Sequence, residues 1–320
     1  MQEKIAFGPV PSRRLGQSLG VNNIPPKICS YSCVYCQIGR TARMLIRRER
    51  FYDPDEIAAA VRLRVEELRK EGEPLDYLTF VPDGEPTLDI NIGREIELLK
   101  PLGVKIAVIT NSSLMWDPDV REALLKADWI SIKLDAASEG IWRRIDRPHG
   151  ALKLEAIYEG IKAFSAEFEG TLATETMLVR GLNDGREEIE RIADLLATIS
   201  PDVSYISIPT RPPAERWVEP PEEENINMAY QIFLKKGVKA EYLIGYEGNA
   251  FASTGDARED LLSITAVHPM REDAVDELLK KTGSGWEIVD GLIEEEALME
   301  LEYEGRRFYM RRLSGIRRGM

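Results

Sequence analysis

The chain has 320 residues, 43% hydrophobic and 30% charged, which is typical of a globular protein with one or two domains. The formal net charge of −13 argues against a uniformly basic surface, so a polyanion is expected to bind only at a local basic zone. No apolar run is long enough for a membrane helix, and the N-terminus lacks the apolar core of a signal peptide, so we expect a cytoplasmic protein without membrane contacts.

The N-terminal stretch combines dense glycine and proline with every cysteine of the chain. Residues 7–27 are predicted to form loop and short extended structure, with one strand at 18–21. Cys29, Cys33 and Cys36 follow within eight residues, and the sequence contains no other cysteine. We expect these cysteines on a loop after the strand, where backbone amides are available to bond to a bound group.

From residue 53 onward, the predicted helices and strands alternate. Asp53 followed by Pro54 is a typical helix start, an apolar stripe follows, and Gly72 marks the end. Short apolar runs then alternate with helical patterns, as in a buried parallel sheet with crossover helices. The predicted strands are 75–81, 104–110, 129–134, 171–179 and 203–208, and the predicted helices are 92–102, 118–127, 152–168 and 187–199. About six βα units result, fewer than in a closed TIM barrel, and a doubly wound open sheet is the alternative.

After residue 208, the sequence is first rich in proline and later rich in glycine, serine and asparagine. Five prolines in residues 209–221 predict a spacer rather than a helix. A helix at 222–236 and an edge strand at 238–244 are predicted to follow. Glycine, serine and asparagine between residues 245 and 255 then predict a boundary.

We therefore divide the chain into a first domain at 1–250 and a small second domain at 256–320. In the second domain, three helical patterns precede two alternating segments joined by a glycine turn, an order that resembles a winged helix. Two local basic zones interrupt the acidic composition, with five arginines at 40–50 and six at 305–320. Such zones are either solvated surface or contacts to an anionic substrate.

The spacing Cys-x3-Cys-x2-Cys restricts the chemistry of the three thiols. Thiolates select soft metals, chiefly zinc, copper(I) and iron–sulfur clusters. A cubane cluster normally takes four cysteines, so three would leave one iron open to a small molecule. Zinc with a histidine ligand is an alternative, but His149 and His268 are both remote in sequence. The odd number of cysteines argues against a disulfide.

Polar residues lie at or near the ends of the predicted strands. Parallel strands end at the same edge of a sheet, so these side chains are expected to lie close together. Alternation along a strand leaves open whether a residue within it points inward. The residues are Gly84 and Glu85 after the strand at 75–81, Asn111 after 104–110, Asp135 after 129–134, Glu175 within 171–179, and Arg211 after 203–208. Arg211 is placed to face an anionic group.

The cysteine spacing, with Tyr35 before the last cysteine, resembles the cluster motif of the radical S-adenosylmethionine (SAM) superfamily. The turn at Gly84 and Glu85 is similar to the Gly-Gly-Glu-Pro motif of that family, with Asp83 in place of the first glycine. The resemblance implies a partial (βα)6 TIM-like barrel, a [4Fe–4S] cluster and SAM. It also implies an external electron donor of the ferredoxin or flavodoxin type.

The same resemblance implies roles for individual residues. SAM would chelate the iron that lacks a thiolate, and the reduced cluster would cleave SAM to methionine and a 5′-deoxyadenosyl radical that abstracts hydrogen from the substrate. The expected cluster ligands are Cys29, Cys33 and Cys36, and the expected SAM contacts are Tyr35, Gly84, Glu85, Asn111 and Asp135. No catalytic acid, base or radical-relay residue is assigned.

Two segments, 7–16 and 33–41, resemble a group of iron–sulfur oxidoreductases related to the wyosine tRNA-modification enzymes. The tRNA enzymes of that group carry a second cysteine triad, which this chain lacks. We expect an enzyme that acts on RNA, tRNA or another anionic molecule. The alternatives are an activase that modifies a partner protein and a non-catalytic iron–sulfur or zinc protein that binds DNA.

Overall fold

The computed structural model describes residues 5–243, 255–267, 269–303 and 305–312. Its centre is an eight-stranded sheet with the order β1-β2-β5-β6-β7-β8-β9-β10. Neighbouring strands are parallel, except that β1 runs antiparallel to β2. The strands are β1 (Ala6–Ser12), β2 (Gly16–Val21), β5 (Tyr77–Phe80), β6 (Lys105–Thr110), β7 (Trp129–Lys133), β8 (Thr171–Met177), β9 (Val203–Ser207) and β10 (Ala240–Leu243).

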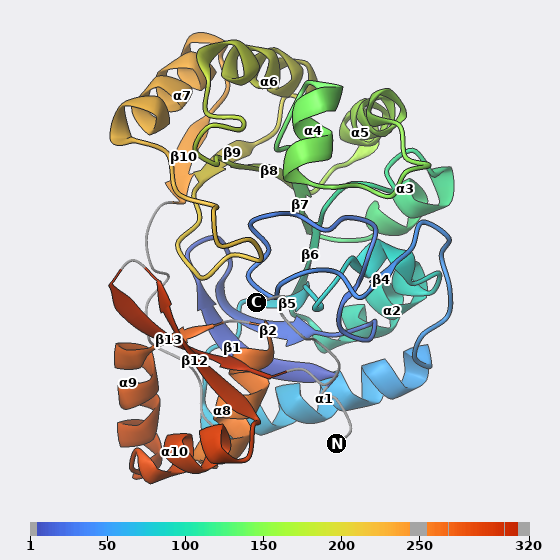
Figure 1. Cartoon of the computed structure of the whole chain (residues 1–320). Coiled ribbons are helices and arrows are strands. Elements are labelled where there is room, and N and C mark those ends of the chain that lie inside the picture. The colour runs from blue at the N-terminus through green and yellow to red at the C-terminus, as the bar shows by residue number, and fades with distance from the viewer. Residues whose placement is uncertain (1–4, 244–254, 268, 304, 313–320) are drawn as a thin grey trace.

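The helices α1 to α7 lie on the outside of this sheet (Figure 1). They are α1 (Pro54–Glu71), α2 (Ile92–Leu99), α3 (Pro118–Leu124), α4 (Glu139–Ile145), α5 (Leu154–Glu167), α6 (Arg186–Ile199) and α7 (Glu223–Lys235), with short 3-10 helices η1 (Pro86–Leu88) and η2 (Lys100–Leu102). In α1, the side chain of Asp53 caps the first turn, and Gly72 ends the helix at a φ of 72°. The expected α/β class and parallel sheet are confirmed. No helix among the described residues is long and apolar enough to cross a membrane.

The prediction of loop for most of residues 7–27 is wrong, because β1 and β2 form a hairpin there. The pairing shifts register between Phe7 and Val10, and Gly16 follows the turn with a φ of 62°. Proline cannot donate to a strand ladder and is therefore confined to edge strands and bulges. Pro9 and Pro11 lie on β1, the edge of the sheet, so the proline density marks an edge strand.

The C-terminal part has a core of its own. It contains α8 (Ala257–Val267), β11 (Met270–Arg271), α9 (Glu272–Thr282), α10 (Glu287–Glu294), β12 (Leu298–Tyr303) and β13 (Arg306–Arg311). The strands form a three-stranded antiparallel sheet with the order β11-β13-β12, so the expected hairpin is present. The division at 250 and 256 and the winged-helix assignment stay predictions, and the proposed boundary lies mostly outside the described residues.

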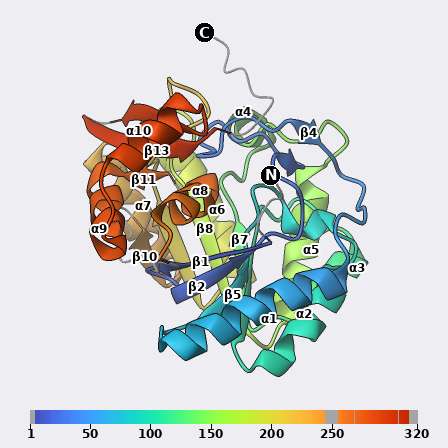
Figure 2. The same ribbon diagram turned by 90° about the horizontal axis from the view of Figure 1, so that it is seen from below.

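The C-terminal part packs against the edge of the large sheet (Figures 1 and 2). Val10 of β1 packs against the C-terminal core. Lys281 of α9 forms an ion pair with Glu73, just after α1, at 3.4 Å. The hydroxyl of Tyr303 donates to the carbonyl of Pro209 at 3.1 Å. The C-terminal part therefore contacts the N-terminal edge strand, the end of α1 and the loop after β9.

A buried pair of carboxyl groups, Asp89 and Glu95, lies behind the turn that follows β5. Both are 0% exposed, and the side-chain amide of Asn23 donates to Glu95 at 3.2 Å. Burial, together with the charge of Asp89, raises the pKa of Glu95 to about 9. At pH values between the ordinary pKa of a glutamate and this raised pKa, Glu95 is protonated in the folded protein and ionised in the unfolded chain.

We expect Glu95→Gln to remove a pH dependence of stability. A raised carboxyl pKa means that stability is greatest below the unfolded pKa and falls as pH rises toward the folded pKa, by at most about 1.4 kcal/mol per pH unit. Glutamine keeps a donor and an acceptor without titrating, so the free energy of unfolding of the variant should change less between pH 6 and 8. Urea unfolding at several pH values measures this slope.

The control is Glu97→Gln, two residues further along α2. Glu97 is exposed and forms an ion pair with Lys126 at 2.6 Å, which holds its pKa below the ordinary value. Glu97→Gln should therefore retain the wild-type slope between pH 6 and 8. Equal slopes for Glu95→Gln and wild type would show that Glu95 is ionised in the folded protein.

Candidate active site

The cysteine loop begins directly after β2 and is held by backbone hydrogen bonds. Cys29 lies on the short strand β3 (Ile28–Cys29), which pairs with β4 (Arg43–Met44). Cys33 and Cys36 lie on the turn that follows, where the amide of Cys36 donates to the carbonyl of Cys33 at 3.1 Å. Two further amides of the loop donate to carbonyls at the C-terminal end of α4. All three thiols are free and half-buried.

The donor set fits a soft-metal cluster better than a single ion. A structural zinc site would need a fourth ligand beside the three thiolates. The amide of His149 does bond to the loop, at the carbonyl of Ser30, but its Nδ1 accepts from the amide of Ala151. A cluster instead takes one thiolate on each of three irons.

The thiols favour the protonated form in the absence of a cation. Burial, with the charge of Glu85 as the next cause, raises the pKa of Cys29 to about 12. Burial also raises the pKa of Cys33 and of Cys36. Metal ions displace the thiol protons when they bind. The positive charge of a bound cluster would therefore stabilise the thiolates, which burial alone disfavours.

The turn after β5 approaches the cysteine loop closely. A Cβ atom on Gly84 would lie 2.0 Å from the carbonyl oxygen of Ile28, so this contact requires glycine. The amide of Glu85 donates to the same carbonyl at 3.1 Å, and the amide of Lys27 donates to the carbonyl of Asp83 at 2.7 Å. The two segments predicted to form the site are therefore joined backbone to backbone.

The carboxylate of Glu85 connects the ends of β5 and β6. It is 1% exposed and accepts hydrogen bonds from the hydroxyls of Thr87 at 2.5 Å and Thr110 at 2.6 Å and from the amide of Asn111 at 2.7 Å. Burial raises its pKa, and these bonds partly offset that shift. The side-chain amide of Asn111 then donates to Sγ of Cys29 at 3.3 Å. Glu85 thus positions Asn111, whose side chain donates to the first cysteine.

Tyr35 and Asp135, both predicted as SAM contacts, bond to each other. The phenol of Tyr35 donates to the carboxylate of Asp135, whose other oxygen accepts from the amide of Met177 at 2.7 Å. Asp135 is 3% exposed. Nζ of Lys133 lies 3.6 Å from Asp135 and 4.9 Å from the centre of the Tyr35 ring. Lys133 and Asp135, at the end of β7, therefore hold Tyr35 in place directly before the last cysteine.

Lys133 extends this contact into a chain of buried charges. Its Nζ lies 3.1 Å from one oxygen of Glu175, and the other oxygen of Glu175 accepts from Arg14 at 2.6 Å. Burial alone would raise the pKa of Glu175, but Lys133 and Arg14 lower it to about 2. Burial alone would lower the pKa of Lys133, but Asp135 and Glu175 raise it. Glu175 therefore points inward, a question that the strand pattern left open.

Two residues of this site were not predicted from the sequence. Asp146 follows α4, a helix that was also not predicted, and its carboxylate lies 3.4 Å from the phenol of Tyr35 and beside the thiol of Cys33. Burial, with the charge of Asp135, raises the pKa of Asp146 well above the ordinary value. Arg14 lies in the N-terminal stretch predicted as loop, 161 residues from Glu175. Neither contact has a local sequence signal.

Several arginines of the two basic zones are neutralised by carboxylates. In the second zone, Arg317 and Arg318 lie outside the described residues. The ion pairs are Arg40 with Glu215, Arg43 with Glu49, Arg307 with Glu272, and Arg312 with Glu296. The described parts of the two zones are therefore less basic than their composition suggests.

Comparison with known proteins agrees with this site. The profile of the Radical SAM superfamily matches residues 23–196, more than half of the chain. The chain therefore belongs to the radical SAM superfamily and is an enzyme. Members of the superfamily use a [4Fe–4S] cluster and SAM, so the predicted cofactors are confirmed.

Within the superfamily, the chain groups with the UPF0026 proteins. It is 47% identical over 311 residues to a UPF0026 protein of Methanocaldococcus jannaschii, covering 97% of this chain and 96% of the relative. It is 38% identical over 221 residues to one of Synechocystis, covering 67% and 78%. The structure of a radical SAM methyltransferase from Sphaerobacter thermophilus is similar with a TM-score of 0.53 and 18% identity, covering 71% of this chain and 66% of that chain. This likeness confirms the partial TIM-like barrel.

Proposed function

We propose that this enzyme holds a [4Fe–4S] cluster with Cys29, Cys33 and Cys36 and uses it to cleave SAM reductively. When bound, the cluster and SAM supply a 5′-deoxyadenosyl radical that abstracts hydrogen from the substrate. The observation that supports this most is that three free thiols share one loop, and that this loop is bonded to the turn at Gly84. We propose a cytoplasmic location and an electron donor of the ferredoxin or flavodoxin type.

The five residues proposed to surround SAM form two groups. Gly84, Glu85 and Asn111 form one group beside the first cysteine, and Tyr35 and Asp135 form the other beside the last. The carboxylates of Glu85 and Asp135 already accept hydrogen bonds from protein donors. We therefore propose that these two carboxylates position Asn111 and Tyr35, which in turn border the cofactor.

It stays a prediction that the substrate is RNA, tRNA or a partner protein. The ion pairs within the two basic zones give no support to an extended RNA-binding surface. The winged-helix assignment and a DNA-binding role likewise stay predictions.

Anaerobic reconstitution of the wild-type protein with iron and sulfide tests the proposal. We expect about four irons and matching sulfide per chain. With SAM and dithionite, the loaded protein should form 5′-deoxyadenosine and methionine, and neither the unloaded protein nor the unreduced mixture should do so. One zinc per chain would favour the non-catalytic DNA-binding protein, and loaded protein that forms no 5′-deoxyadenosine would refute SAM cleavage.

A further inference from the structure

The side-chain amide of Asn111 presents its donor end to the first cysteine. Its Oδ1 accepts from the backbone amide of Ser113 at 2.9 Å, and a backbone N–H can only donate. The NH2 end of the group therefore faces the other way. Its two hydrogens are donated to Sγ of Cys29 at 3.3 Å and to the hydroxyl of Ser30 at 3.0 Å. The sulfur thus meets a hydrogen-bond donor whose orientation is set by the backbone.

Further contacts hold this donor in place. The backbone amide of Asn111 donates to the buried carboxylate of Glu85 at 2.7 Å. The hydroxyls of Ser30 and Ser113 bond to each other, so the second acceptor of the amide group is also fixed. A donor that is already oriented needs no reorganisation when negative charge develops at the sulfur.

The surroundings of the first cysteine otherwise oppose negative charge. Burial and then the charge of Glu85 are the largest causes that raise the pKa of Cys29. The backbone amide of Tyr31 and the side chain of Asn111 act in the opposite direction and favour the thiolate. A side-chain donor can be replaced by mutation, whereas a backbone amide cannot, so the effect of Asn111 is open to measurement.

We propose that Asn111 raises the reduction potential of the cluster through its hydrogen bond to Sγ of Cys29. The potentials of iron–sulfur clusters depend on hydrogen bonds to the sulfurs, on net charge and on solvent exposure. Reduction moves one electron from the external donor to the cluster, and hydrogen bonds to a more negative acceptor are stronger. The bond therefore stabilises the reduced cluster more than the oxidised one. The inference rests on the proposed function, because it takes Cys29 to be a cluster ligand.

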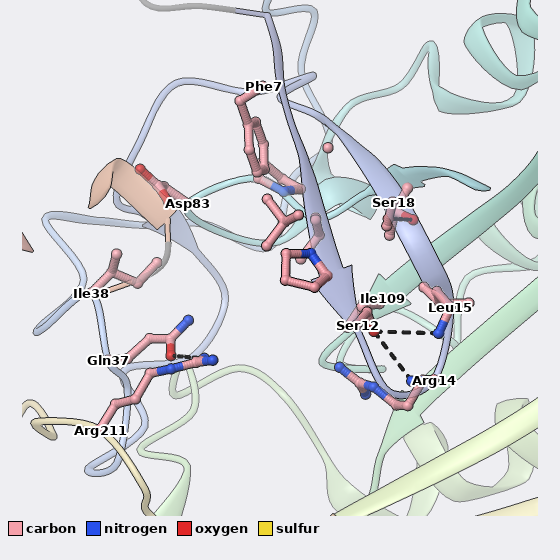
Figure 3. Close-up of a pocket in the computed structure, with 16 residues that line it drawn as sticks. Phe7, Ser12, Arg14, Leu15, Ser18, Gln37, Ile38, Asp83, Ile109 and Arg211 are labelled. Atoms are coloured by element: carbon pink, nitrogen blue, oxygen red, sulfur yellow. Dashed lines mark hydrogen bonds between the residues drawn. The ribbon is translucent and has the colours of Figure 1, made fainter. Parts of the chain in front are cut away.

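A cavity of about 170 Å³ borders the cysteine loop on another side, between the β1–β2 hairpin and the strands β5 and β6 (Figure 3). It reaches Gln37 and Ile38, the two residues after the last cysteine. Arg211 donates there to the amide oxygen of Gln37 at 2.8 Å, and its contact with an anionic group stays a prediction. Neither Cys29 nor Asn111 is among the described residues that line this cavity. Replacement of Asn111 is therefore not expected to admit water to the cluster from the cavity.

A redox titration of the reconstituted protein tests the inference. It is carried out without SAM, because Asn111 is also a proposed SAM contact, and the EPR signal of the reduced cluster gives the midpoint potential. Asn111→Leu removes the donor without adding charge. At the wild-type midpoint, its ratio of reduced to oxidised cluster should fall at least about threefold, which is roughly 28 mV for one electron. Asn111→Asp keeps the acceptor for Ser113 but places a carboxylate beside the sulfur, so it should lower the potential at least as far.

Ser113→Ala is the matched control. It removes a buried hydroxyl of the same turn and keeps the backbone amide that orients Asn111, so its midpoint potential should equal that of wild type. Iron content is measured on the same samples.

The outcomes separate this inference from the proposed function. A wild-type protein that binds no four-iron cluster overturns the proposed function and this inference with it. If the wild type is loaded, unchanged potentials in both Asn111 variants overturn this inference alone. The same holds if Ser113→Ala lowers the potential equally, or if both Asn111 variants fail to bind a cluster that Ser113→Ala binds.

Discussion

The Cys33→Ala variant is expected to keep its fold and to lose both the cluster and SAM cleavage. Cys33 is one of only three cysteines, so no other thiol is available to replace it. A cubane held by two thiolates has two irons without a protein ligand. After anaerobic reconstitution, we expect less than about one iron per chain. The rate of 5′-deoxyadenosine formation should fall at least about 10³-fold, the scale on which loss of a catalytic group acts.

Ser32→Ala is the control for disturbance of the loop. Ser32 precedes Cys33, and its hydroxyl accepts a hydrogen bond from the amide of Thr41 at 3.2 Å. Its removal costs about 1 kcal/mol and takes away no metal ligand, so the variant should keep its iron. The unloaded forms of both variants should melt close to the unloaded wild type. Full iron loading of Cys33→Ala would exclude Cys33 as a ligand.

Lys133→Met is expected to destabilise the fold strongly. Nζ of Lys133 lies between the carboxylates of Asp135 and Glu175, and its side chain is 15% exposed. Removing one partner of a buried ion pair costs about 3–5 kcal/mol, because the remaining charge is left uncompensated. Urea unfolding of the unloaded protein should show a loss of this size. The pKa of Glu175 should rise, because Lys133 is the largest cause that lowers it.

Lys126→Met provides the comparison at the surface. Lys126 forms an ion pair with Glu97 at 2.6 Å, and the two side chains are 32% and 56% exposed. Exposed pairs contribute roughly 0–1 kcal/mol, so this variant should unfold almost as wild type does. If the two lysine variants lose the same stability, the buried charges at the end of β7 are solvated and do not depend on Lys133.

The sequence predicted most of the scaffold because its signals are local. Buried parallel strands show as short apolar runs, and crossover helices show as apolar stripes between caps. Gly84 and Glu85 were found through their resemblance to a family motif, and Asn111 because residues at the ends of parallel strands converge. The structure brings them together at Cys29, and their contacts with SAM stay predictions.

The remaining contacts depend on the folded chain and have no local pattern. Arg14 meets Glu175 only because the hairpin and β8 face the same interior. The hairpin itself was missed because proline argues against central strands, whereas β1 is an edge strand. Asp146 was missed along with α4, whose 7 residues are too few for a clear helical period.

The position of β1 between two cores has a consequence for biosynthesis. A ribosome makes β1 before the other strands of this sheet, and domains fold from the N-terminus as they emerge. Val10, however, packs against the core built from α8 to β13, which is made after the entire barrel. The edge strand β1 therefore gains its outer cover only after the barrel has been translated. Until then, β1 is an open edge on which a nascent chain can pair wrongly.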